Sequence, residues 1–190
     1  MFQEKEAQSD QEPEIERVAV KIKALMLGLD QAGKTTILYR MKLGEVISAI
    51  ATNGFNYEEI KYKNYDFEIW DVGGKEDIRP LWQNYYKDNP KAIIFVVDAH
   101  ETDPQRIQEA ADELQKLMNL PQLKEAPFLI YANKHDLPKA MDSSEIAEKF
   151  NLEGFKDQKW FIQACCAKTG EGLYQGLDYL MNHFDNDQAE

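Results

Sequence analysis

The stretch Gly28-Leu-Asp-Gln-Ala-Gly33-Lys34-Thr35 decides the fold, because it matches the phosphate-binding pattern G-x-x-x-x-G-K-[ST]. An apolar segment precedes it and a helical segment follows, which is the context that this loop requires. Its glycines allow consecutive backbone N–H groups to close around phosphate oxygens, with the helix N-terminus adding partial positive charge. The N–H groups concerned are those of Gln31, Ala32 and Gly33. In this pattern Lys34 reaches the β- and γ-phosphates, and the Thr35 hydroxyl ligates Mg²⁺.

Hydrophobic periodicity on either side of the loop predicts alternating strands and helices. Residues 18–27 alternate apolar and polar side chains and then become wholly apolar, as in a half-buried strand that enters a core. Further strands are predicted at 55–62, 65–70, 91–97, 127–132 and 160–164. Helices are predicted at 34–43, 103–118 and 143–150, and Leu173, Leu177, Leu180 and Met181 mark a last amphipathic helix.

This order of elements predicts the α/β class. We expect a six-stranded, mostly parallel sheet with one antiparallel hairpin, turned at Lys63-Asn64, and helices on both faces. Ligands of such sheets bind beyond the carboxyl ends of the strands, so the functional residues are expected in the loops there.

The stretch Asn133-Lys134-His135-Asp136 follows a predicted buried strand and indicates which base is bound. The aspartate can accept hydrogen bonds from both guanine N1–H and N2–H₂, whereas adenine offers no such pair of donors. Asn133 can hold the loop and the base edge, and the stem of Lys134 can lie over the ring. After the last strand, Cys166-Ala167-Lys168 supplies a third loop, in which the Ala167 N–H can donate to guanine O6.

Two further stretches predict contacts at the terminal phosphate. Asp71-Val-Gly73-Gly74 ends the second strand of the hairpin, where Asp71 can hold Mg²⁺ through water and the Gly74 N–H can contact a γ-phosphate. Thr52 lies upstream in a loop, where its hydroxyl and carbonyl can complete the metal shell. Thr52 and Gly74 would then sense the same phosphate and be released after its hydrolysis.

The formal net charge is −12 at pH 7, and much of it lies at the two ends of the chain. An acidic surface excludes nucleic acid as a partner and opposes adsorption to anionic lipid. We expect three regions: an acidic, disordered extension at 1–17, a nucleotide-binding domain at 18–184, and an acidic tail at 185–190. The alternative for the extension is a specific docking arm.

The only cysteines are Cys165 and Cys166, and their adjacency excludes a disulfide framework, a CxxC redox pair and a zinc cluster. No run approaches the roughly 18 apolar residues of a membrane-spanning helix, and residues 1–4 show no secretory signal. A reduced, cytoplasmic protein is therefore expected.

The sequence resembles the Arf (ADP-ribosylation factor) family of small GTPases over about residues 21–180. The motifs are GLDQAGKTTILY (28–39), GFNYE (54–58), WDVGG (70–74), IRPLW (78–82), NKHDLP (133–138) and CAKTGEGLYQGLD (166–178). The resemblance implies the small-GTPase (Ras-like P-loop) fold with GTP or GDP and Mg²⁺ as ligands. The implied phosphate contacts are Asp30, Lys34, Thr35 and Thr36, the metal ligands Thr35 and Thr52, and the guanine contacts Asn133, Lys134, Asp136 and Ala167.

The resemblance also implies a surface for protein partners. Phe55, Trp70 and Tyr85 would form an exposed aromatic cluster for effectors, the alternative being packing within the core or the hairpin. The hairpin from 55 to 70 would slide between nucleotide states. Effectors and exchange factors are thus expected between Thr52 and Phe55, at Trp70, and between Gly74 and Tyr85.

The chain departs from the family pattern at several positions. Lys75 stands where the family has a glutamine that orients the attacking water, and an ammonium group donates hydrogen bonds but cannot accept them. Phe2 replaces the glycine that is myristoylated in Arf proteins, so no lipid anchor of the chain's own is expected. Asn53 replaces an aliphatic residue and Ala51 a proline, which weakens any inference of typical Arf partners.

The leading interpretation is a monomeric GTP/GDP switch that hydrolyses GTP slowly, with Lys34, Gly74 and Lys75 as the groups at the reacting phosphate. The alternative is a GTP-bound interaction module with little or no hydrolysis. A P-loop phosphotransferase is a third interpretation, but it needs a lid of arginines, and the chain has only Arg17, Arg40, Arg79 and Arg106. The expected location is the cytoplasm, with recruitment to a membrane by a protein partner left open.

Overall fold

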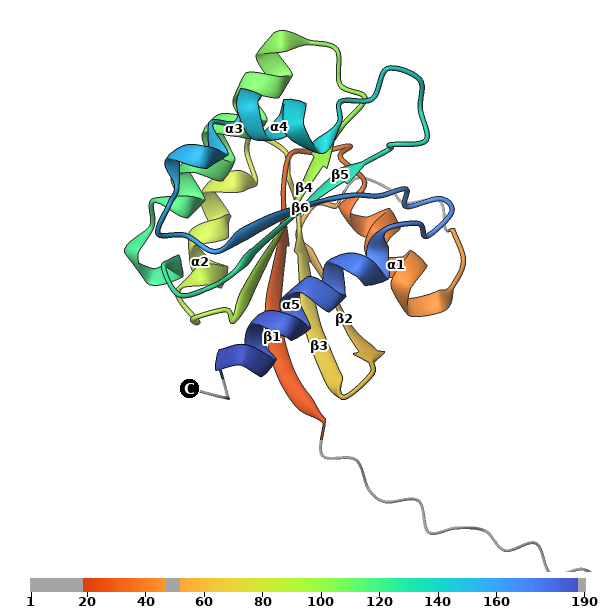
Figure 1. The fold of residues 1–190 in the computed structure, drawn as a ribbon, viewed down its shortest axis with the longest axis vertical. Coiled ribbons are helices and arrows are strands. Elements are labelled where there is room, and N and C mark those ends of the chain that lie inside the picture. Colours follow the sequence, from red (N-terminus) through yellow and green to blue (C-terminus); the bar gives the residue numbers. More distant parts are fainter. Residues whose placement is uncertain (1–18, 47–51, 188–190) are drawn as a thin grey trace, which may run out of the picture.

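The computed structural model describes residues 19–46 and 52–187 and contains one six-stranded sheet (Figure 1). The strand order is β2-β3-β1-β4-β5-β6, and every neighbouring pair is parallel except the antiparallel β2–β3 hairpin. The strands are β1 (Val20–Leu27), β2 (Phe55–Tyr62), β3 (Tyr65–Val72), β4 (Ala92–Asp98), β5 (Phe128–Asn133) and β6 (Trp160–Ala164). The predicted fold class is confirmed.

Five α-helices in the described part of the chain cover both faces of the sheet, with α1 and α5 on one face and α2, α3 and α4 on the other (Figure 1). They are α1 (Lys34–Leu43), α2 (Trp82–Tyr86), α3 (Pro104–Met118), α4 (Ser143–Lys149) and α5 (Leu173–Asp187). Short 3₁₀ turns occur at Arg79–Leu81, Pro121–Leu123 and Leu152–Gly154. Within the described residues, no helix has the length and apolar character that crossing a membrane requires.

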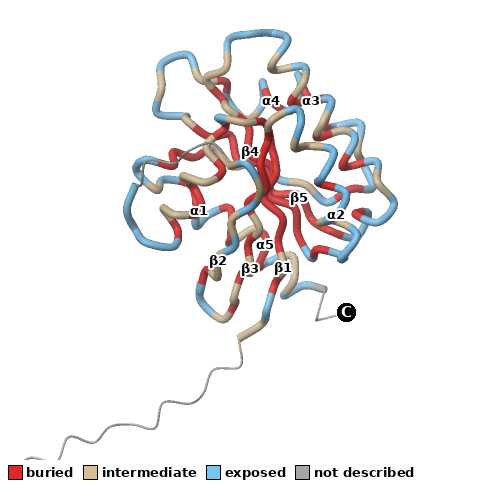
Figure 2. The backbone as a smooth tube through the Cα atoms, turned by 180° about the vertical axis from the view of Figure 1, so that it is seen from behind, coloured by how far each residue is buried: buried red, intermediate tan, exposed pale blue. Residues whose placement is uncertain are grey.

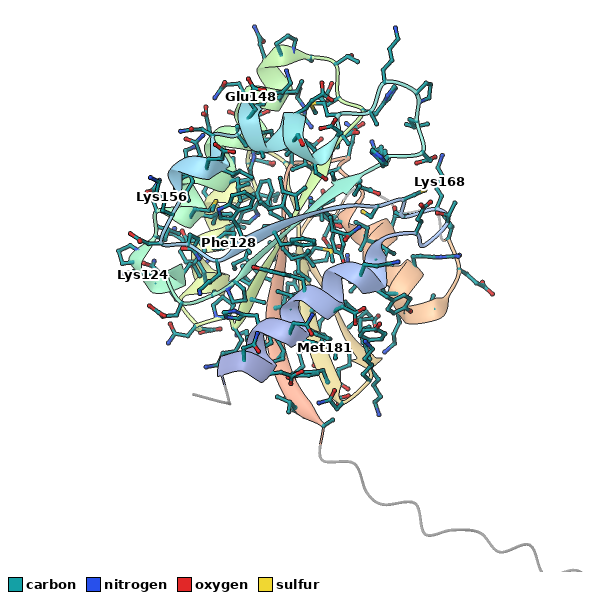
Figure 3. The ribbon with its side chains drawn as sticks, viewed as in Figure 1. Lys124, Phe128, Glu148, Lys156, Lys168 and Met181 are labelled. Atoms are coloured by element: carbon teal, nitrogen blue, oxygen red, sulfur yellow. The ribbon has the colours of Figure 1, made fainter. Side chains whose placement is uncertain are left out.

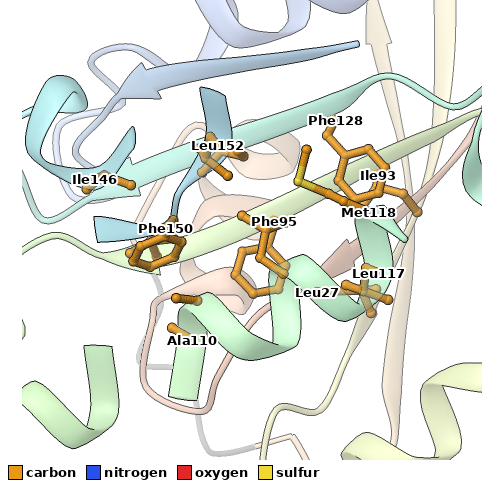
Figure 4. Packing of buried hydrophobic residues seen from close by; sticks show 14 of the residues in the cluster. Leu27, Ile93, Phe95, Ala110, Leu117, Met118, Phe128, Ile146, Phe150 and Leu152 are labelled. Atoms are coloured by element: carbon orange, nitrogen blue, oxygen red, sulfur yellow. The ribbon is translucent and has the colours of Figure 1, made fainter. Parts of the chain in front are cut away.

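The central strands are buried on both faces, as their apolar runs predict (Figure 2). On β1, Leu25 and Leu27 belong to the cluster under α2, α3 and α4, whereas Ala24 and Met26 belong to the cluster under α1 and α5. The first cluster includes Phe95, Phe128 and Phe150 (Figure 4). Phe128 of β5 and Met181 of α5 lie in the packed interior, while Lys168 projects from the β6–α5 loop (Figure 3).

Local signals set several helix ends where the sequence predicts them. α1 ends at Gly44, which has φ 71° and donates its N–H to the Arg40 carbonyl. α3 begins after Asp103, whose carboxylate accepts from the Gln105 N–H. α5 continues through Asp187, so residues 185–187 are helical and the boundary predicted for the acidic tail falls inside this helix. The Tyr65 hydroxyl donates to Asp185 at 2.5 Å, which joins this last turn to the hairpin.

Some expectations lie outside the described residues: the acidic extension at 1–17, the first predicted strand residue Val18, the departure at Ala51, and the last three residues of the tail. The described sheet nevertheless fixes where the functional loops meet. The connection after β1 leads through α1 to β2 on one side of it, whereas the connection after the neighbouring strand β4 leads through α3 to β5 on the other side. The loop after β1 therefore lies at a topological switch point, beside the loops that follow β3 and β5.

Candidate nucleotide-binding site

The loop from Gly28 to Gly33 packs so closely on its neighbours that both end positions require glycine. Gly28 has φ 134°, and a Cβ there would lie 2.3 Å from the Val96 carbonyl oxygen. Gly33 has φ 98°, and its Cβ would lie 2.2 Å from Asn133 Nδ2. A side chain at either position would displace the loop from the N-terminus of α1, where unpaired helix N–H groups can bind an anion.

Lys34 is the first residue of α1 and is almost completely buried. Its ammonium group donates to the carbonyl oxygens of Gly28 and Leu29, both at 2.8 Å. Burial lowers the pKa of Lys34 to about 8, although the carboxylates of Asp71 and Asp30 oppose the shift. Since an opposite charge nearby stabilises a buried ammonium, this side chain is suited to bind a phosphate group.

A second cluster of polar side chains links three segments: the loop that contains Thr52, the start of α1 and the end of β3. The Thr35 hydroxyl donates to Asp71 Oδ2 at 2.6 Å and lies 3.1 Å from the Thr52 hydroxyl. Asn56, which the sequence analysis did not single out, donates to Asp71 Oδ2 at 2.9 Å and to the Thr52 hydroxyl at 3.3 Å. Asn56 and Asp71 are direct partners in the β2–β3 register, so the hairpin holds this side chain in place.

The donor set of this cluster fits a hard cation. Asp71 Oδ1 is buried and has no hydrogen-bond partner in the described structure, and two threonine hydroxyls lie beside the same carboxylate. No group of three or more His, Cys, Asp or Glu side chains within 19–46 and 52–187 could hold a metal by itself. One carboxylate with hydroxyl groups matches Mg²⁺, which binds few protein ligands and completes its shell with water and phosphate oxygens.

The loops that contain Thr52 and Gly74 meet at the phosphate side of the site. The Gly73 N–H donates to the Gly54 carbonyl at 2.9 Å, and the Asp30 N–H donates to the Gly74 carbonyl at 3.1 Å. A cavity of about 240 Å³ lies between these loops and α1. It is lined by Asp30, Gln31, Gly33, Lys34, Thr35, Thr36, Thr52, Gly73, Gly74 and Lys75. Apart from Ala32 and Asp71, every residue predicted for phosphate, metal or catalysis lines this cavity.

The residues predicted for the guanine base lie together at the ends of β5 and β6. Asn133, 1% exposed, donates from Nδ2 to the Ala32 carbonyl at 2.8 Å and accepts at Oδ1 from the Ala167 N–H at 3.0 Å. Asn133 therefore ties the phosphate loop to the loop at 166–168. In this structure the Ala167 N–H, predicted to donate to guanine O6, is bonded to Asn133 instead.

The other side chains at the base end differ in exposure. Cys166 is buried, Lys134 is partly buried, and Asp136 and His135 are exposed. The Lys134 ammonium donates to Asp98 Oδ2 at 2.5 Å, and Asp98 is a residue that the sequence analysis missed. This ion pair fixes the stem of Lys134 at the end of β4.

The model of the ADP-ribosylation factor family matches residues 12–184 of the chain. The chain belongs to the ADP-ribosylation factor (Arf) family. Among solved structures, it is similar to the Arl6 (BBS3) small GTPase from Trypanosoma brucei with bound GppNp, a nucleotide analogue. The two share 31% sequence identity, the match covers 88% of this chain and 99% of the other, and the TM-score is 0.77. The resemblance inferred from the motifs is confirmed, and the chain is an Arf-family small GTPase.

In this Arf-family protein, the predicted aromatic cluster forms and also includes Tyr57. Phe55 lies 5.0 Å from Trp70 and 5.9 Å from Tyr85 between ring centroids, and Tyr57 lies 5.0 Å from Trp70. Phe55 is 49% exposed and Tyr57 41% exposed, whereas Trp70 and Tyr85 pack partly on the core. The inner rings pack on the core and support an outer pair that faces solvent, while binding of effectors to this cluster stays a prediction.

The described arginines Arg40, Arg79 and Arg106 are each bonded to other protein groups. Arg106 donates to Asp30 Oδ1, Arg79 pairs with Glu109, and Arg40 donates to the Thr169 carbonyl. Within the described residues no arginine lines the cavity. The lid that a phosphotransferase requires is therefore not formed by Arg40, Arg79 or Arg106, while Arg17 lies outside the described residues.

Arg106 is another residue that the sequence analysis did not assign to the site. Burial raises the pKa of Asp30, but hydrogen bonds from Gln31 and Arg106 outweigh it and hold that pKa below its ordinary value. Arg106 also donates to the Asp30 carbonyl at 3.0 Å. It therefore braces the phosphate loop from α3.

Proposed function

We propose that this Arf-family protein is a GTP/GDP switch that binds Mg²⁺ and hydrolyses GTP to GDP and phosphate slowly. The observation that carries the proposal is the lining of the 240 Å³ cavity, which combines the phosphate loop with Thr52 and with Gly73–Lys75. A terminal phosphate in this cavity would touch both loops, and its loss would release them. The nucleotide state would thereby change the surface around Phe55 and Tyr85.

For the metal, we assign Thr35 and Thr52 as hydroxyl ligands and Asp71 as a carboxylate acting through water. When bound, Mg²⁺ supplies positive charge at the phosphate oxygens. The other roles in binding the phosphates belong to residues of the chain. Asn56 and Thr35 orient the Asp71 carboxylate, Lys34 supplies a second positive charge, and the Gly74 N–H is a donor for the terminal phosphate.

For the base, we assign Asp136 as the acceptor for guanine N1–H and N2–H₂, with the Lys134 stem over the ring. The ion pair of Lys134 with Asp98 supports this role because it holds the stem in one conformation. Asn133 has a positioning role, since both ends of its amide bind backbone groups. The Ala167 N–H would exchange Asn133 Oδ1 for guanine O6, or share its hydrogen bond between them.

Slow hydrolysis follows from the chemistry of Lys75. A glutamine at this position would offer both a donor and an acceptor to the attacking water, whereas an ammonium offers donors only. The Lys75 ammonium donates to Asn53 Oδ1 at 3.0 Å, so it is held at the edge of the cavity. This contact also favours the second candidate function, a GTP-bound interaction module with little or no hydrolysis.

The surface for protein partners would comprise Phe55, Tyr57, Trp70 and Tyr85, together with the loops on either side of the cavity. The Trp82 indole N–H donates to the Gly73 carbonyl at 2.9 Å, so movement of the Gly73 loop would be passed to α2 and to Tyr85. Effectors and exchange factors are the proposed partners of a monomeric chain. The acidic charge and the absence of cysteine pairs support a cytoplasmic location, with a protein partner as the route to a membrane.

The test is single-turnover GTP hydrolysis by the natural chain and by Lys75→Gln, each with Mg²⁺ and with a chelator. We expect Mg²⁺-dependent hydrolysis in both proteins and a faster rate in Lys75→Gln. A natural chain as fast as the variant would show that Lys75 is a working catalytic group and would contradict slow hydrolysis. GTP left intact by the natural chain but cleaved by Lys75→Gln would establish the interaction module.

A further inference from the structure

One side-chain hydrogen bond joins the two loops that border the phosphate cavity. Lys75 Nζ donates to Asn53 Oδ1 at 3.0 Å, across 22 positions of the sequence. Both residues are departures from the Arf pattern, which has a glutamine at position 75 and an aliphatic residue at position 53. An aliphatic side chain at position 53 offers no acceptor, so the bond depends on the asparagine. The two departures therefore act on each other.

The backbone on both sides of this bond is anchored. The Gly73 N–H donates to the Gly54 carbonyl at 2.9 Å, and the Lys75 carbonyl accepts from the N–H groups of Ile78 and Arg79 at 2.9 and 3.0 Å. The space between the loops is also closed, because a Cβ on Gly73 would lie 2.5 Å from the Thr52 carbonyl oxygen. The backbone segments on both sides of the bond are thus fixed by hydrogen bonds. The side chain of Lys75 still has rotational freedom along its stem, and the bond to Asn53 restricts it by holding the ammonium group.

The held ammonium group keeps donors for a ligand. It has three N–H groups, and its bond to Asn53 uses one of them. Within residues 19–46 and 52–187 it makes no other side-chain or backbone hydrogen bond. Lys75 also lines the cavity together with Lys34 and Thr52. An anion in the cavity would thus find two lysines, one at the base of the phosphate loop and one at the junction of the two loops.

We infer that Asn53 is a positioning residue that holds Lys75 for the terminal phosphate of GTP, so that the pair makes the site prefer a nucleoside triphosphate to a diphosphate. This inference rests on the proposed function. A lysine ordered before binding loses less side-chain entropy when the phosphate arrives, so the contact is stronger than that of a free lysine. GDP lacks the third phosphate and gains nothing from the pair.

The experiment measures the affinity of the full chain for GDP and for GppNp with Mg²⁺, and takes the ratio of the two. The variants are Lys75→Met, Asn53→Ala, Asn53→Gln and the double variant Asn53→Ala/Lys75→Met. Lys87→Met is the matched control, because Lys87 is an exposed lysine away from the cavity. Thermal unfolding of each protein verifies that it is folded.

We expect Lys75→Met to lower the preference for GppNp about tenfold or more, as the loss of a charge-assisted hydrogen bond does. Asn53→Ala should lower it by a smaller factor and should have no further effect when Lys75 is already Met. Asn53→Gln, which keeps an amide acceptor, should recover part of the loss, and Lys87→Met should change nothing. Affinity for GDP should stay within about twofold throughout, because GDP lacks the phosphate that the pair of Asn53 and Lys75 would contact.

The inference is overturned if Asn53→Ala leaves the ratio of GppNp affinity to GDP affinity unchanged. It is also overturned if Asn53→Ala lowers this ratio by the same factor in the natural chain and in the Lys75→Met protein. A change in GDP and GppNp affinity by the same factor would also overturn it, because a purely structural role predicts that result. If the folded natural chain binds neither nucleotide, the proposed function itself fails, and that outcome is distinct from the others.

Discussion

Binding of a nucleotide phosphate should draw a proton onto Lys34, and the size of this effect follows from the burial of the side chain. In the structure the pKa of Lys34 is about 8, against an ordinary value of 10.5, because the side chain is buried. That difference corresponds to on the order of 3 kcal/mol of penalty for holding the charge in its buried position. Phosphate oxygens beside Nζ supply the missing counter-charge and should return the pKa toward or above its ordinary value.

The sign of the pH dependence differs between folding and binding. Because the folded pKa lies below the unfolded one, the unfolded chain binds more protons between pH 8 and 10.5, and the contribution of Lys34 to the free energy of unfolding rises with pH there. Nucleotide binding has the opposite sign, since the bound state holds the extra proton. Affinity should therefore fall with pH above about 8, by as much as about tenfold per pH unit.

The assay is isothermal titration of GDP and Mg²⁺ into the empty chain, repeated in buffers of different ionisation enthalpy. Near pH 7 about 0.1 proton should be taken up per site, and near pH 8 about 0.5, as expected for one group of pKa about 8. Lys34→Met, measured at concentrations that saturate it, gives the uptake by all other groups. It also corrects for loss of the guanine N1 proton in alkaline solution. Equal uptake at the two pH values, or equal uptake in the natural chain and Lys34→Met, would refute the reasoning.

Two substitutions test the packing of the site. In Gly74→Ala the new Cβ would meet the Gly28 carbonyl oxygen at 2.2 Å, so the loop must move away, and the free energy of unfolding from urea titration should fall by about 1–3 kcal/mol. Asn133→Ala removes buried hydrogen bonds to Ala32 and Ala167 and leaves both backbone groups unpaired. It should lower the free energy of unfolding by about 2–4 kcal/mol and raise the dissociation rate of GDP.

His135→Ala is the control for Asn133→Ala, because it changes an exposed side chain two positions away. Its effect on the free energy of unfolding should stay within about 0.5 kcal/mol. An Asn133→Ala protein as stable as His135→Ala would show that the two backbone groups find other partners. A Gly74→Ala protein with unchanged stability would show that the loop has room for a methyl group.

The parts of this protein that could be predicted from sequence are those governed by neighbours along the chain. Helix α1 was predicted at its observed bounds because Gly44 can take the left-handed conformation that ends a helix. β2, predicted as an aromatic-rich strand, and β6 were also predicted at their observed bounds. α2 was missed because five residues are too few to show a helical period, and its Trp82 is held by the Gly73 carbonyl rather than by local signals.

The site divides in the same way. In the phosphate loop and in the Asn133–Asp136 stretch, the residues that would contact phosphate or guanine follow one another in the sequence. The local sequence is therefore enough to predict both of these stretches. The contacts that join these stretches are not local. Asn56 reaches Asp71 through the register of a hairpin, Arg106 reaches Asp30 across 76 positions, and Lys134 reaches Asp98 because parallel strands end side by side.

By itself, therefore, the sequence determined the order of the six strands and of the four longer helices, the phosphate loop, the guanine-type motif and the family. Only the tertiary structure decided that Asn53 and Lys75, two departures that look unrelated along the chain, form one contact at the edge of the phosphate cavity. The reason is physical: periodicity and turn residues act over a few positions, whereas pairing between distant loops depends on how the whole sheet brings its strand ends together.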